Sequence, residues 1–138
     1  MVKRKLLLVI TAMLLIISVS LSVLAGPVPD IGRKCSVTIQ FRANGQPVPG
    51  GSVICTRVGY IYQNGANYSF RRVLDHQDLV NLQNSDTAIE LERFVKQNNI
   101  TGVAKNVSRY GVVKYEDLQT GVYLIRQKDP ANGYLPMK

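Results

Sequence analysis

Histidine and cysteine are scarce in this 138-residue chain, which has one histidine and two cysteines. His76, with Asp75 and Asp78 nearby, offers too few ligands for a zinc site, which takes three or four at defined spacing. The chain also has no Gly-rich phosphate loop and no Ser/His/Asp pattern. Glu116 and Asp117 are adjacent, so on a strand they point to opposite faces and do not form a carboxylate pair. We therefore expect no metal, no cofactor and no enzymatic activity.

A clustered basic face is also lacking, although the formal net charge is +8. Removing Lys3, Arg4 and Lys5 from the 17 basic residues leaves 14 against 9 acidic residues, a net charge of +5. The remaining basic residues are scattered, apart from the adjacent pairs Arg33-Lys34 and Arg71-Arg72. Nucleic-acid recognition needs a clustered basic face, so we expect no nucleic-acid partner. A scattered positive balance instead favours weak attraction to anionic cell-wall polymers or membranes.

The N-terminal 25 residues have the three parts of a secretory signal peptide. A basic start is followed by an apolar run from Leu6 to Leu24, and Ala25 is a suitable residue before the cleavage point. An uncleaved anchor is the alternative, because about 19–20 apolar residues can span a bilayer, and it would be the chain's only membrane contact. We expect the protein to be secreted or on the extracellular cell surface. Residues 26–34 are rich in Pro and Gly and predict a linker.

Residues 35–138 predict a single, mainly β domain. Residues 35–41 alternate apolar and polar side chains, which places 35, 37, 39 and 41 on a core face. Ser52 to Val58 is expected to return from the breaker-rich loop 44–51 as the partner strand. Asn64-Gly65 between two alternating runs is a strong hairpin signal. Further strands are expected at residues 103–107, 112–115 and 121–127, before a turn at 129–133.

A helical insert is expected over about residues 78–99. Thr87 and Glu90 fit the capping-box pattern at a helix start. The apolar stripe at helical spacing consists of Ala88, Leu91, Phe94 and Val95. This pattern predicts a helix from about Asp86 to Asn98, ended by Asn98-Asn99 and Gly102, which accept the left-handed conformation.

Cys35 and Cys55 both lie on predicted core faces. A disulfide between them suits an exported protein. In the predicted hairpin, however, Cys55 is about four residues out of register with Cys35, which exceeds the roughly 7 Å Cα separation that a disulfide tolerates. Two outcomes stay open: a disulfide allowed by a bulge in the loop, or two buried thiols that act as small apolar side chains.

Three tyrosines, Tyr60, Tyr62 and Tyr68, gather on the hairpin predicted around Asn64-Gly65. Tyrosine has a large amphipathic surface and is enriched at interfaces, so one interpretation is a binding patch. The other is that these are ordinary half-buried strand tyrosines. The sequence leaves both interpretations open.

Three segments with characteristic spacing together carry a resemblance to a known family. They are residues 45–51 with the strand that follows, residues 67–70 before the helical insert, and residues 113–124 followed by Gly133-Tyr134. Together they resemble the prealbumin-like (Cna protein B-type) domains of Gram-positive surface proteins and pilins. The similarity is greatest to the N-terminal pilin-type domain, which carries a helical insertion. The resemblance implies a prealbumin-like (Ig-like) β-sandwich in which Tyr115, Leu118 and Tyr123 pack the core and Gly121 permits close strand approach.

The resemblance also implies a non-catalytic structural or adhesion module of a bacterial surface or pilus-like protein. Many family members join a lysine of the first strand to an Asn or Asp of the last strand. Gln40 replaces that lysine here, Gln127 replaces a frequent acid, and the last strand is expected to be missing, so we expect no self-crosslink. The groove left open suits another surface-protein domain or a strand donated by another chain. The alternative is a free secreted binding protein for a cell-wall polymer or host ligand.

Overall fold

The computed structural model describes residues 30–135; the predicted signal peptide and residues 26–29 of the predicted linker lie outside this range. Two of its three sheets have two strands each. β1 (Lys34–Gln40) pairs antiparallel with β8 (Val112–Gln119). β2 (Arg42–Ala43) and β3 (Gln46–Pro47) form a short hairpin.

The third sheet is built around one long strand, β4 (Ser52–Asn64). On one side β4 pairs with β7 (Val103–Asn106) near its start and with β5 (Asn67–Arg72) near its end, and β5 pairs with β6 (Asp78–Leu79). On the other side β4 pairs with β9 (Val122–Asp129). All of these pairings are antiparallel. Among the described residues, two strands have neighbours along both edges: β4 lies between β9 and the β5 and β7 strands, and β5 lies between β4 and β6.

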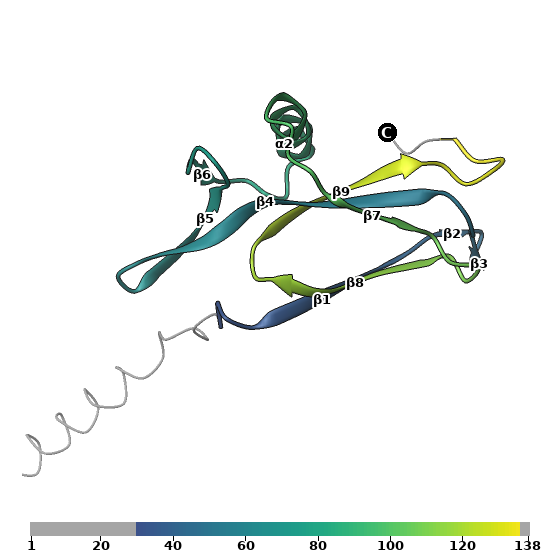
Figure 1. Cartoon of the computed structure of the whole chain (residues 1–138), viewed down its shortest axis with the longest axis horizontal. Helices are drawn as coiled ribbons and strands as arrows, with labels where there is room; N and C mark the ends of the chain where they lie inside the picture. The colour runs from purple at the N-terminus through teal and green to yellow at the C-terminus, as the bar shows by residue number, and fades with distance from the viewer. Residues whose placement is uncertain (1–29, 136–138) are drawn as a thin grey trace, which may run out of the picture. The chain divides into compact units, whose positions relative to one another are not determined.

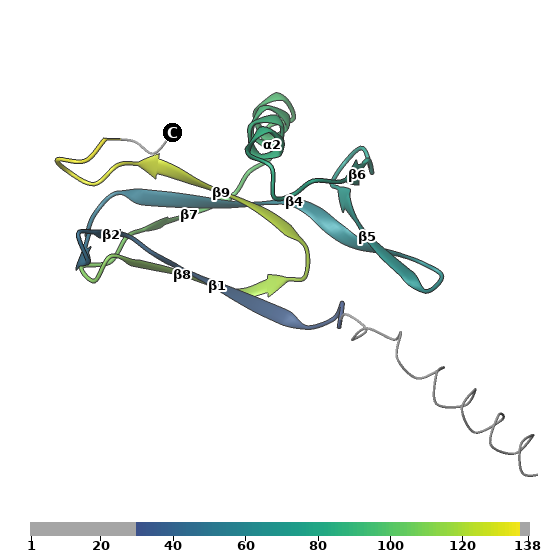
Figure 2. The same ribbon diagram turned by 180° about the vertical axis from the view of Figure 1, so that it is seen from behind.

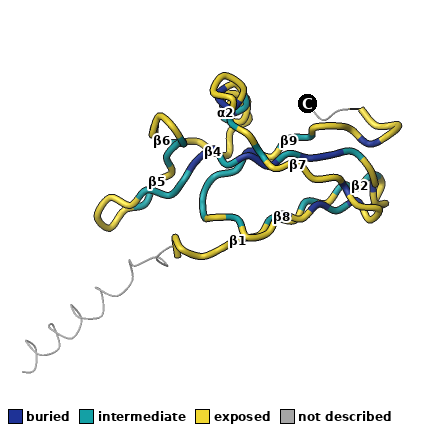
Figure 3. The backbone as a smooth tube through the Cα atoms, viewed as in Figure 1, coloured by how far each residue is buried: buried dark blue, intermediate teal, exposed yellow. Residues whose placement is uncertain are grey.

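The β1–β8 sheet and the β4 sheet form two layers, with the β4–β5 hairpin extending beyond the lower layer (Figures 1 and 2). Between the layers lies a core of Val53, Cys55, Val107, Val113 and Tyr115. The dark blue stretches of Figure 3 include the first part of β4, from Ser52 to Gly59, and Val113 and Tyr115 are the buried residues of β8. The protein is therefore mainly β, with two layers that do not close into a barrel.

The helix α2 (Ser85–Gln97) covers the outer face of the β4 sheet (Figure 1). Its Leu91 and Val95 pack against Val58 of β4 and Leu124 of β9, so this sheet is covered on both faces. The predicted helix is confirmed to within one residue at each end. Its cap differs from the prediction, because the Asn84 side chain accepts the hydrogen bond from the Asp86 backbone N–H.

The Thr87 capping box is therefore wrong: Thr87 Oγ1 donates instead to the Asn81 carbonyl oxygen at 3.0 Å. Of the predicted stripe, Ala88 is exposed, while the other three side chains are buried. The predicted end is correct, since Asn98 is the C-cap and Asn99 follows in the left-handed conformation at φ 52°.

The predicted hairpin between residues 35–41 and 52–58 is also wrong. β1 and β4 belong to different layers, and the segment between them contains the β2–β3 hairpin. By contrast, the hairpin at Asn64-Gly65 is confirmed, with Asn64 paired to Asn67 across the turn. The two predictions differ in the length of the connection. A two-residue turn fixes the pairing of the strands on either side of it, whereas a long loop does not.

Candidate functional site

One edge of the smaller sheet, along β8, is occupied by side chains and loop backbone. The Ser108 backbone N–H donates to the Val112 carbonyl oxygen at 3.0 Å, and Ser108 Oγ accepts from the Val112 N–H at 3.2 Å. Further along, Lys105 Nζ donates to the Lys114 carbonyl oxygen at 2.9 Å. Because an exposed strand edge invites pairing, such contacts protect this edge from another strand.

The opposite edge, along β1, has no such cover. In an antiparallel pair of strands, two residues directly opposite each other both point their backbone N–H and C=O groups toward the partner strand, or both point them away from it. Gln40 lies opposite Val112 and Thr38 lies opposite Lys114. Since the Val112 and Lys114 carbonyls point away from β1, Thr38 and Gln40 point their N–H and C=O groups away from β8. β1 has no second strand partner in the part of the chain that the structure describes.

The core is also thinner beside β1 than beside β8. Val113 and Tyr115 of β8 are each only 2% exposed. On β1, the core-facing Val37 and Ile39 are only half-buried, as is Phe41 directly after the strand. Apolar side chains that remain half-exposed at a sheet edge can bury further area against an added strand.

β9 has an open edge as well, and it lies on the same flank as that of β1. β7 lies beside the outer edge of β8, because Lys105 of β7 reaches that edge. β9 pairs with β4 on the edge opposite to β7, and β1 pairs with β8 on the edge opposite to Lys105. The two layers are therefore both unpaired on the β1–β9 flank within residues 30–135.

The tyrosine hairpin presents two faces rather than one patch. Cross-strand partners are Tyr60 with Arg71 and Tyr62 with Ser69, so these four residues share a face. Tyr68 lies opposite Gln63 and is therefore on the other face of the hairpin. Tyr60 and Tyr62 remain candidates for one binding surface, and Tyr68 belongs to a different one.

Contacts within the protein already engage the first of these faces. The Arg71 guanidinium lies 3.6 Å from the centroid of the Tyr62 ring and forms a 3.0 Å ion pair with Asp78. The Tyr60 hydroxyl is hydrogen-bonded to His76 Nδ1 at 2.8 Å. His76, the chain's single histidine, is exposed and adopts the left-handed conformation at φ 58°.

Both arginines of the adjacent pair Arg71-Arg72 form ion pairs with acids. Arg72 forms a two-pronged ion pair with Asp75, in which Arg72 Nε donates to Asp75 Oδ1 at 2.9 Å. This hydrogen bond holds the pKa of the Asp75 carboxyl below its usual value. This basic pair is thus matched by two neighbouring acids, Asp75 and Asp78.

Both cysteines are free thiols in two different settings. Cys55 is buried in the core between the layers, and this burial raises the pKa of its thiol. Cys35, predicted on the core face, is instead exposed, at the start of β1 opposite Leu118. The register of β1 shifts between Cys35 and Val37, so the alternation that the sequence predicts is interrupted there.

The four residues of the family-like motif have structural positions. Tyr115 is buried and its hydroxyl donates to the Val53 carbonyl oxygen at 2.7 Å. Leu118 and Tyr123 are half-buried and pack against the same core. A Cβ on Gly121 would lie 2.5 Å from the Gly59 carbonyl oxygen, so only glycine allows this approach between β9 and β4.

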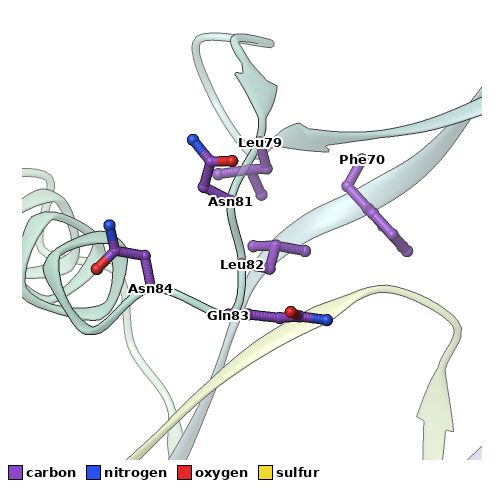
Figure 4. Close-up of a pocket in the computed structure, with 6 residues that line it drawn as sticks. All are labelled: Phe70, Leu79, Asn81, Leu82, Gln83 and Asn84. Carbon is purple, nitrogen blue, oxygen red and sulfur yellow. The ribbon is translucent and has the colours of Figure 1, made fainter.

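The described residues form shallow hollows at the surface. One of them, of about 630 Å³, lies beside the β5–β6 region and is lined by Phe70, Leu79, Leu82 and three amide side chains. In Figure 4, Phe70, Leu82 and Gln83 lie on one side of the intervening chain, while the Asn81 and Asn84 amides lie on the other. These polar groups do not converge on one point, as a small-molecule site requires.

Residues 30–135 contain no group of three or more His, Cys, Asp or Glu side chains placed to hold a metal ion. Within the same residues, no helix has the length and apolar character needed to cross a bilayer.

The chain was compared with family models, curated proteins and solved structures. The chain matches no family model, no curated protein and no solved structure. The family resemblance therefore stays a prediction that rests on the sequence elements.

Thr38 did not stand out in the sequence, and Gln40 stood out only as the residue in place of a family lysine, although both define the open edge. Their polar side chains indicate only the exposed face of a strand. Whether a strand lies at an edge depends on which strands pair, and that is decided by residues far away in the chain, such as Lys105 and Lys114. Alternation carries no signal for it.

Proposed function

We propose that this chain is a non-catalytic structural or adhesion module, secreted or held at a bacterial cell surface, in a surface or pilus-like assembly. The proposal includes the finer fold assignment, a prealbumin-like sandwich with a helical insert. The observation that carries it is the flank of β1 and β9. Among the described residues, each layer of the two-layer β domain ends there in a strand whose outer edge has no partner.

An unpaired flank favours an assembly role for a physical reason. Unsatisfied backbone donors and acceptors at an edge bind another strand, and natural proteins usually cover such edges. Here the β8 edge is covered by Ser108 and Lys105, whereas the β1 edge is not. A domain that protects one edge and leaves the other open is suited to join another chain there.

The test is where the full chain goes in expressing Gram-positive cells. We expect a single species near the mature mass in the medium or in the wall fraction, after removal of the 25-residue signal. A mature species that stays with the wall until it is released by denaturant supports an assembly module. Retention of the uncleaved chain in the cytosol would reject the proposal.

A free secreted binding protein is the second candidate, and the tyrosine hairpin is the observation that favours it. The exposed turn at Gly65 carries tyrosines on both faces close to its tip. Binding of the chain to isolated cell walls would be compared for Tyr62→Ala and for Tyr68→Ala, which lie on opposite faces. A loss confined to one variant locates a binding face, and unchanged binding in both argues against this candidate.

A further inference from the structure

We infer that the β1 edge binds an extended segment of another protein chain, in which apolar residues alternate with acidic ones. This rests on the proposed function, because it names the partner of the same flank. The added strand would pair with the outward-pointing N–H and C=O groups of Thr38 and Gln40. It would thereby extend the two-stranded β1–β8 sheet to three strands.

The apolar half of that pattern follows from the core. Side chains of an added strand alternate between its two faces, so every second residue would point between the layers. There it would meet Val37 and Ile39, which are only half-buried, unlike the two nearly fully buried core residues of β8. Each apolar side chain brought into this position removes further nonpolar surface from water.

The acidic half follows from the charges along the strand. Residues 31–43 hold three cations, Arg33, Lys34 and Arg42, and no acid. The other exposed side chains of β1 carry no charge at neutral pH, namely Cys35, Ser36, Thr38 and Gln40. Carboxylates on an added strand would thus meet cations and no acid along β1 itself, which favours both encounter and register.

The same charges argue against a second copy of this chain as the occupant. Pairing β1 with β1 of another copy would bring three cations of each strand to one seam, where like charges destabilise cross-strand contacts. The other open edge on this flank, along β9, also carries more cations than acids, with Arg126 and Lys128 against Asp129. The occupant is therefore a different, acidic chain.

The experiment uses the exported full chain and synthetic peptides of about nine residues, enough to run along a strand. The test peptide alternates valine and glutamate. One control replaces glutamate by lysine, and another keeps the composition but separates valine and glutamate into two blocks. Amide hydrogen exchange and a peptide titration, both followed by NMR, give the protection of Thr38 and Gln40 and the Kd.

We expect the Thr38 and Gln40 amides to exchange rapidly in the free chain, unlike those of Val37 and Ile39, which face β8. The alternating glutamate peptide should slow both by about tenfold or more. The lysine and block peptides should not. Amides of Thr38 and Gln40 that are already protected in the free monomer would overturn the inference, and so would equal binding of the lysine peptide.

A matched pair of proline variants separates the two edges. Thr38→Pro removes an outward N–H from β1, and Lys114→Pro removes one from β8 at the same position of the ladder. We expect Thr38→Pro to weaken peptide binding by about tenfold and Lys114→Pro to change it less than about twofold. Gln40→Pro is the substitute if Thr38→Pro does not fold. Equal effects of the β1 and β8 variants would contradict the assignment to β1.

Failure of this inference and failure of the proposed function look different. If the chain is exported and wall-associated but no glutamate peptide binds, the partner chemistry is wrong and the surface role stands. If the chain is retained uncleaved in the cytosol, the surface role itself is wrong, whatever the peptides do.

Discussion

At the scale of single residues, two buried hydroxyls in β4 and β8 are in opposite situations. Tyr115 donates to the Val53 carbonyl oxygen, while Thr56 is fully buried and its Oγ1 has no hydrogen-bond partner among the described residues. Removing a satisfied polar group and removing an unsatisfied one should therefore change stability in opposite directions.

Tyr115→Phe keeps the ring in the core but removes its hydrogen bond. We expect the free energy of unfolding to fall by about 1–2 kcal/mol, because the Val53 carbonyl oxygen loses a buried donor. Urea denaturation followed by circular dichroism measures this. Tyr134→Phe, at an exposed tyrosine, is the control and should change nothing. Wild-type stability of Tyr115→Phe would contradict the role of this bond.

Thr56→Val replaces the hydroxyl by a methyl group of similar size. Because the hydroxyl is buried without a partner, we expect the free energy of unfolding to rise by about 1 kcal/mol. The same denaturation experiment applies, with Thr38→Val on the exposed face of β1 as the control. A clear loss of stability in Thr56→Val would show that the hydroxyl does have a partner, such as a buried water.

At the scale of elements, the sequence predicts local structure well and pairing poorly. The α2 helix and the hairpin at Asn64-Gly65 are decided by nearby residues, and both are confirmed. The partner of β1 is decided by residues about 75 positions away in β8, and it was predicted incorrectly. Alternation indicates which face of a strand is buried; it does not say which strand lies beside it.

The candidate site was accessible to sequence reasoning only in part. The family-like motif led to Tyr115, Leu118, Gly121 and Tyr123, which all have structural positions in or beside the core. The sequence analysis grouped three tyrosines, but Tyr68 lies on the other face of the hairpin. Which residues of the two strands share a face depends on the register of their pairing, and the sequence pattern did not give that register. Gln40 was named only as the position of a family lysine, and the outward direction of the Thr38 and Gln40 backbone groups follows only from the topology.

The α2 helix begins with a cap that can be tested. The Asn84 side chain accepts a 3.0 Å hydrogen bond from the Asp86 backbone N–H. We expect Asn84→Ala to lower the free energy of unfolding by about 1 kcal/mol, the usual cost of losing such a cap. Thermal unfolding measures the change, with the exposed Asn132→Ala as the control. Equal stability of the two variants would show that α2 is held by its packing alone.

At the scale of the whole molecule, ionisation limits stability on both sides of neutral pH. Burial raises the pKa values of Cys55, Tyr115 and Tyr123, so each binds its proton more tightly in the folded state. Ion pairs and hydrogen bonds lower the pKa values of Asp75, Glu92 and Glu116. The first group makes folding less favourable at high pH, and the second at low pH.

We therefore expect a plateau of stability between about pH 5 and pH 8. As the pH rises above the unfolded-state pKa of the Cys55 thiol, about 8.5, the unfolded chain loses its proton first and stability falls. As the pH falls through the lowered carboxyl pKa values, the ion pairs lose their charge and stability falls again. Urea midpoints measured from pH 3 to pH 11 test this. Cys55→Ala should flatten the alkaline decline, and an unchanged decline would argue that the tyrosines dominate.

The division of the first and last described strands between two layers has a mechanical consequence. β1 and β9 share no ladder of hydrogen bonds within residues 30–135, so tension applied across them would pass from one layer to the other through the chain connections and through side-chain packing. Packing slides apart under less force than a ladder that must be sheared all at once. A strand from another chain that pairs along this flank would therefore carry part of the tension, and the domain would resist extension most after assembly.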